Sequence, residues 1–133
     1  MDEVVTKIYR RLLQNGFEHT GSIENPSIFL DTKLEGISLC SQAGRDYMNI
    51  YIDIKRGVIT DIKYLCFCDP TSNIVAETLC QLARGKTVEE VKALNRDDFF
   101  KAIGSDTELI QKKVTGILEL LDRGISRFEC GVV

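Results

Sequence analysis

The chain has 133 residues, of which 44% are hydrophobic and 28% charged, and its formal net charge is −3. This length suits one domain with its own core, and we expect a single domain over 1–133, with the core at about 4–128 and a short C-terminal tail. The negative charge argues against general binding to nucleic acid or to an anionic membrane surface, and no apolar run approaches the length of a membrane span.

The first third of the chain predicts one helix and one strand. Apolar residues recur at helical spacing near the N-terminus, at Val4, Val5, Ile8, Tyr9, Leu12 and Leu13. Asn15-Gly16 supplies a stop signal for this helix. The alternation of side chains over 28–34 then predicts a strand.

A hairpin is predicted in the middle of the chain. In DYMNIYIDI, the residues Met48, Ile50 and Ile52 fall on one face and the polar residues on the other. The glycine of Lys55-Arg56-Gly57 suits a tight turn, and a second strand follows from Val58 to about Phe67.

Helices fill the rest of the chain. Asp69-Pro70 is typical of an N-cap and first helical residue, and Gly85 ends that helix. Capping boxes at 87–90 and 105–108 predict two more helices, the last of which is long and keeps one face apolar as far as Phe128. The order indicates an α+β fold, in which a three-stranded antiparallel sheet packs against several helices.

Two cysteines flank Phe67 where the hairpin runs into a helix. On an extended strand Cys66 and Cys68 share a face and are separated by about 6.6 Å, so we expect no disulfide between them. Cys66 is expected to fill the core, as free cysteines commonly do. Cys68 lies one residue before a helix N-terminus, where the helix dipole lowers the pKa of a thiol, so it is a candidate for reaction or metal binding.

The remaining polar candidates are spread along the chain. Cys40 lies in a Gly/Ser/Gln loop, Asp46 opens the following strand, and His19, the only histidine, is expected to face solvent. The five cysteines follow no disulfide-scaffold spacing and the N-terminus carries no secretory-signal pattern, so we expect a cytoplasmic protein.

Several motifs in order resemble the NifU N-terminal/IscU family of iron–sulfur cluster assembly scaffolds. Gly44-Arg45-Asp46-Tyr47-Met48-Asn49-Ile50 is similar to the family's entry to its second strand. Ile59-Thr60-Asp61-Ile62 is similar to its strand after a glycine turn, and Gly85-Lys86-Thr87-Val88-Glu89-Glu90 to the segment after its central helix. The likeness runs from about 8 to 128 and implies a SufE/NifU-like fold.

The resemblance also implies a site, with departures. Two of the family's three ligand cysteines align with Gly44 and with Asp69, one residue after Cys68, and the third falls within 112–115, which holds no cysteine. Asp46 matches a family site residue in place. The implied metal ligands are therefore Asp46, Cys68, Asp69 and Cys40, with iron or an iron–sulfur cluster as the bound group and zinc as an alternative.

Three functions remain open at this point. The first is a non-enzymatic, divergent assembly protein that binds iron or a transient cluster and works with a cysteine desulfurase, a partner that the resemblance implies. The second is a SufE-like sulfur acceptor that carries a persulfide on Cys40. The third is a docking module that kept the fold and lost the ligands.

Overall fold

The computed structural model describes residues 3–37, 39 and 47–131. Its elements in chain order are α1 (Glu3–Asn15), β1 (Ile28–Asp31), α2 (Thr32–Glu35), β2 (Tyr47–Lys55), β3 (Val58–Phe67), α3 (Pro70–Ala83), α4 (Val88–Lys92), α5 (Arg96–Ile103) and α6 (Glu108–Glu129). In these ranges no helix combines the length and the apolar character needed to cross a membrane.

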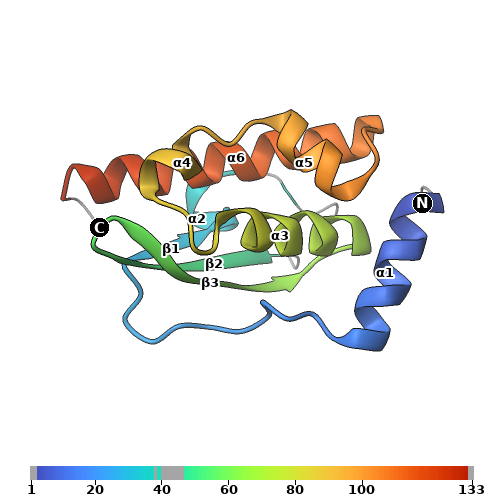
Figure 1. Ribbon diagram of the computed structural model, residues 1–133, viewed down its shortest axis with the longest axis horizontal. Coiled ribbons are helices and arrows are strands. Elements are labelled where there is room, and N and C mark those ends of the chain that lie inside the picture. Colours follow the sequence, from blue (N-terminus) through green and yellow to red (C-terminus); the bar gives the residue numbers. More distant parts are fainter. Residues whose placement is uncertain (1–2, 38, 40–46, 132–133) are drawn as a thin grey trace.

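A three-stranded antiparallel sheet in the order β1-β2-β3 is the only sheet among the described residues. α3 packs on β3 and α6 on β1, and α4 and α5 pack in turn on these two helices (Figure 1). α1 lies at one end of the molecule, away from the other helices except for contacts with α3 and α5 (Figure 1). The α+β fold predicted from the sequence is confirmed.

The hairpin of β2 and β3 forms as predicted. Met48, Ile50 and Ile52 are fully buried on the face of β2 that meets the helices. Arg56 and Gly57 connect the strands with φ of 54° and 75°, and positive φ at both central residues is typical of a type I′ turn. This turn matches the right-handed twist of the strands and so fixes their register.

The strand predicted over 28–34 is shorter than expected, because β1 ends at Asp31. The Asp31 carboxylate accepts a hydrogen bond of 2.9 Å from the Lys33 N–H and caps the short helix α2. The Thr32 hydroxyl oxygen then accepts a bond of 3.1 Å from the Met48 N–H. A side chain thus replaces the main chain as the partner of β2 at this point, and the alternation beyond Asp31 belongs to a helical turn.

The predicted helix starts are partly right. Asp69 caps α3 ahead of Pro70, and the capping box that begins at Thr87 is present. The box predicted at 105–108 is wrong, since α6 begins after Thr107 without a side-chain cap. α5, which the sequence analysis missed, begins with a reciprocal cap between Asn95 and Asp98.

Two glycines let α6 approach its neighbours closely. A Cβ at Gly124 would lie 2.9 Å from a methyl carbon of Leu30 on β1. A Cβ at Gly116 would lie 3.1 Å from a methyl carbon of Leu39. Distances near 3 Å are too short for carbon atoms in contact, so the side-chain-free positions on α6 set its distance from β1 and from Leu39.

Candidate functional site

The predicted site residues in the described part of the chain lie where β3 runs into α3. β3 ends at Phe67, so Cys68 and Asp69 form the link to the first turn of α3, which carries Ser72. Lys113 reaches the same place from α6. We call Cys68, Asp69, Ser72 and Lys113 the β3–α3 corner.

The Asp69 carboxylate has two tasks at this corner. Its Oδ1 atom accepts a hydrogen bond of 2.9 Å from the Ser72 N–H, which caps α3, and both of its oxygens lie 3.2 Å from the Ser72 hydroxyl. Its Oδ2 atom also accepts a bond of 3.1 Å from the Lys113 ammonium. The negative charge of Asp69 is therefore balanced by a lysine on α6, a helix that is distant in the chain but adjacent in the fold.

The Lys113 ammonium lies in a small cage of oxygen atoms. The side chain of Lys113 is only 5% exposed, and its Nζ donates to the main-chain oxygen of Leu39 at 2.6 Å as well as to Asp69. The Ser72 hydroxyl lies 3.2 Å from the same Leu39 oxygen. A buried ammonium needs such partners, because burial removes its water shell and hydrogen bonds from the protein must replace it. The corner is thus built to hold positive charge.

Lys113 was not among the residues predicted for the site, although its position on α6 carried a signal. Ile110 and Ile117 are fully buried on α6 and stand three and four residues from Lys113. Residues at this spacing share a helix face, so a lysine lies within the apolar stripe that packs against the sheet. A charged residue on such a stripe indicates a buried partner elsewhere in the fold.

Cys68 is half-buried and packs against the core beside Cys66. Its sulfur lies 3.2 Å from the main-chain oxygen of Tyr47 and is disulfide-bonded. Cys66, Cys80 and Cys130 are not in disulfides, so the expectation that Cys66 and Cys68 form no bridge with each other is confirmed. Because a metal ligand must be a thiolate, Cys68 becomes available to a metal ion only after reduction.

The predicted ligand set of Asp46, Cys68, Asp69 and Cys40 stays a prediction. The structure places Cys68 and Asp69 in succession at the corner, whereas Cys40 and Asp46 lie outside the described residues. Within 3–37, 39 and 47–131, no three His, Cys, Asp or Glu side chains gather as a metal site.

A divalent metal ion fits this corner only if Lys113 moves. The Asp69 oxygen that would bind the ion already accepts from the ammonium. Two unit charges 4 Å apart interact by about 4 kcal/mol at an effective dielectric constant of 20, and a divalent ion would be repelled more strongly. The residues present therefore suit a metal ion that is exchanged rather than one that is held permanently.

A second buried polar cluster corrects the expectation for His19. The side chain is 7% exposed instead of facing solvent, and its Nδ1 lies 2.5 Å from Oε2 of Glu77 on α3, itself 2% exposed. The Tyr64 hydroxyl donates to the other Glu77 oxygen at 3.3 Å. Burial raises the pKa of Tyr64 and the charge of Glu77 raises it further, so the phenol keeps the proton that it donates. We call these three residues the His19–Glu77–Tyr64 cluster.

Comparison with known proteins identifies a matching family model and two similar sequences. The family model described as "NifU-like N terminal domain" matches residues 15–130. Two curated relatives from Archaeoglobus fulgidus, named iron–sulfur cluster assembly scaffold proteins IscU 1 and IscU 2, are each 36% identical over 59 residues. That segment is 44% of this chain and spans only 39% of the length of each relative.

Solved structures share the fold over nearly the whole chain. A NifU-like N-terminal protein from Brucella abortus is 11% identical with a TM-score of 0.59, covering 95% of this chain and 94% of its own. A protein described as a scaffold for the SUF system from Fervidobacterium islandicum AW-1 is 12% identical with a TM-score of 0.62, covering 94% and 96%. At these identities the likeness concerns the fold alone.

Proposed function

Because the chain belongs to the NifU-like N-terminal domain family, we propose that it takes part in iron–sulfur cluster assembly and binds iron or a transient cluster at the β3–α3 corner. The observation that carries the proposal is the oxygen cage around the Lys113 ammonium, formed by Asp69 and the Leu39 carbonyl, with Cys68 preceding Asp69 in the chain. A carboxylate and a carbonyl oxygen thus stabilise positive charge one residue away from a sulfur ligand. Iron is the substrate of this process rather than a resident cofactor.

The proposed ligands are Cys68 and Asp69, joined by Cys40 and Asp46. Cluster iron is held mainly by thiolates, so two sulfurs and two carboxylates favour single iron ions or short-lived clusters, with zinc as a competitor. The disulfide at Cys68 must first accept two electrons and two protons from a dithiol reductant, which is itself oxidised to a disulfide.

Lys113 makes the bound iron exchangeable. Iron that binds Asp69 displaces the ammonium, and the ammonium returns to Asp69 when the iron leaves. The apo protein therefore never carries an uncompensated carboxylate at this corner, and it passes iron on instead of storing it. The chain acts as a carrier without enzymatic chemistry of its own, and a cysteine desulfurase is the proposed source of sulfur.

Anaerobic reconstitution tests the proposal. The reduced protein is mixed with ferrous iron, cysteine and a desulfurase, and bound iron is measured by elemental analysis and by visible absorbance. We expect Cys68→Ser to abolish binding, and Lys113→Met to slow the loss of iron to a chelator at least about tenfold, since the competing charge is gone. Lys112→Met and Cys130→Ser are matched controls, because both side chains are exposed and lie away from the corner.

Two outcomes contradict the proposal. Iron uptake that is unchanged in Cys68→Ser places the iron elsewhere. Failure of the wild-type protein and of Lys113→Met to bind iron favours a docking module that retains only the fold.

A sulfur acceptor is the second candidate, and the disulfide at Cys68 favours it. A sulfur that forms a disulfide is placed for exchange with other thiols. Once a dithiol has reduced the disulfide, a desulfurase persulfide gives its terminal sulfur to a thiol of this chain, which becomes a persulfide while the desulfurase cysteine returns to a thiol. Mass spectrometry after mixing with a desulfurase and cysteine would show a persulfide on Cys40 or Cys68, without bound iron.

A further inference from the structure

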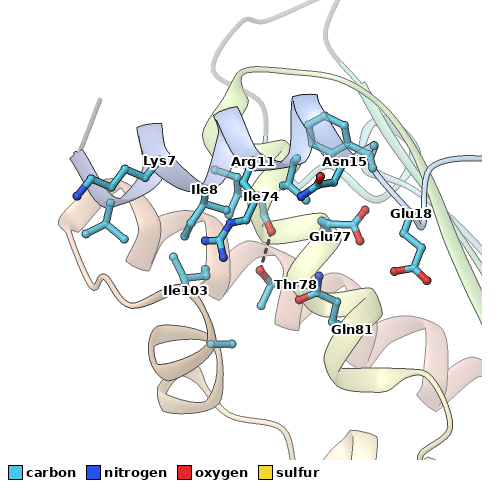
Figure 2. A pocket seen from close by; sticks show the side chains of 15 residues that line it. Lys7, Ile8, Arg11, Asn15, Glu18, Ile74, Glu77, Thr78, Gln81 and Ile103 are labelled. Atoms are coloured by element: carbon cyan, nitrogen blue, oxygen red, sulfur yellow. Dashed lines mark hydrogen bonds between the residues drawn. The ribbon is translucent and has the colours of Figure 1, made fainter.

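A large hollow lies between α1 and the helices α3 and α5, away from the β3–α3 corner. Its volume is about 640 Å³, within the range typical of small-molecule sites. Figure 2 shows α1 along one side and α3 across the floor, with Ile103 of α5 at one end and Glu18 at the other.

Several apolar side chains border the hollow. α1 is strongly amphipathic, yet Val5 is its only fully buried residue among those described. Ile8 and Leu12 stay half-buried and face the hollow from α1, while Ile74 of α3 and Ile103 of α5, both almost fully buried, lie in its opposite wall. The apolar surface that α1 leaves open to this space favours a ligand with an apolar body.

Two basic side chains, Lys7 and Arg11, line the hollow. Arg11 points into it beside Ile74 and Thr78 (Figure 2), and it makes no hydrogen bond or ion pair with any residue that the structure describes. The Gln81 amide also faces the hollow (Figure 2). Glu77 lines the wall, but its oxygens are taken by His19 and Tyr64. The guanidinium is therefore left to an anion from solution.

The distribution of charge selects the kind of ligand. Lys7 and Arg11 are one turn apart on α1, whereas the exposed acid Glu18 lies at the far end of the hollow from Lys7 (Figure 2). We propose that the hollow binds a small monocarboxylate with an aliphatic or aromatic body, whose carboxylate pairs with Arg11 and whose body packs against the half-buried Ile8 and Leu12 of α1. Arginine suits this task, because its planar fork matches a carboxylate in two hydrogen bonds.

Titration with octanoate, followed by amide chemical shifts, tests this site without iron. Octanamide is the neutral control of the same length. We expect saturable binding of octanoate with shifts confined to α1, α3 and α5, and at least about tenfold weaker binding of octanamide, since hydrogen bonds to charged groups contribute about 1.5–3 kcal/mol.

Two variants of adjacent arginines sharpen the test. Arg11→Gln should weaken octanoate binding about tenfold or more, and Arg10→Gln, which alters an exposed residue outside the hollow, should leave it unchanged. Thermal unfolding of both variants confirms that α1 is still folded. Equal affinities for octanoate and octanamide, equal effects of the two variants, or no saturation at millimolar concentration would overturn the proposal. Failure of iron binding alone would not affect it.

Discussion

The imidazole of His19 and the carboxylate of Glu77 meet in the interior, with 2.5 Å between Nδ1 and Oε2, although 58 residues separate them in the chain. Main-chain hydrogen bonds also join the segment around His19 to β3. The Tyr64 N–H donates to the His19 carbonyl at 3.1 Å, and the Gly21 N–H donates to the Tyr64 carbonyl at 2.9 Å. The link between α1 and β1 is thus fastened to both α3 and β3 by buried polar groups.

Replacing His19 should destabilise the fold strongly. In His19→Leu the buried Glu77 keeps the Tyr64 hydroxyl but loses the imidazole, and an uncompensated buried carboxylate costs about 3 kcal/mol. Urea denaturation would measure the change. The double variant His19→Leu/Glu77→Leu should recover much of the loss, and Glu18→Leu, at an exposed neighbour, is the control. A single variant within about 0.5 kcal/mol of wild type would show that the cluster contributes little.

Removing Asp69 should lower the free energy of unfolding more than removing Lys113, its partner in the corner ion pair. Asp69→Ala removes the cap of α3 and leaves Lys113 buried without its carboxylate, so we expect a loss of about 3 kcal/mol or more. Lys113→Met keeps the cap, and the Asp69 carboxylate that remains is 23% exposed and still accepts from Ser72, so this variant should cost about 1 kcal/mol. Thermal and urea unfolding of the apo proteins would compare them, and equal losses would contradict this asymmetry.

Local patterns in the sequence were sufficient for the sheet and for the start of α3, because alternation over 47–54 and the pair Asp69-Pro70 act through neighbours in the chain. Contacts between residues far apart in the chain could not be predicted from local patterns. Nothing near His19 points to Glu77, and the oxygen cage of Lys113 combines α3, α6 and Leu39. At Thr32 the alternation was misleading, since a hydroxyl took over the pairing of the main chain.

The contact between α2 and α6 should make stability depend on pH in the acidic range. The hydrogen bond from Arg127 lowers the pKa of Glu35, burial opposes this, and the charges of Arg127 and Arg123 add to it. A lowered pKa means that the stabilisation is present above the unfolded value, about 4.3, and is lost as the pH falls through the lower folded value.

Unfolding of wild type and of Glu35→Gln, measured between neutral and acidic pH, isolates this contribution. The difference between the two proteins should shrink as the pH falls and also at high salt, because the two arginines are about two-fifths exposed. A difference that is constant across this range would contradict the assignment to the carboxylate charge.

The three cysteines that form no disulfide in the described part of the chain should be alkylated in order of their exposure. Cys130 is exposed, Cys66 is half-buried and Cys80 is fully buried. Burial also raises the pKa of Cys80, so that little thiolate is present at neutral pH. With iodoacetamide and no reductant, mass spectrometry should find Cys130 modified first, Cys66 later and Cys80 only after unfolding. Early modification of Cys80 in the native protein would contradict this packing.

The two glycines of α6 have an electrostatic consequence. Gly116 lies one turn after Lys113 and rests on Leu39, whose carbonyl accepts from the ammonium. Gly124 rests on β1 about three turns after Lys113. Any added bulk at these positions would lift α6 and draw the amine back from Asp69. The ion pair between Lys113 and Asp69 therefore depends on two positions of α6 that carry no side chain.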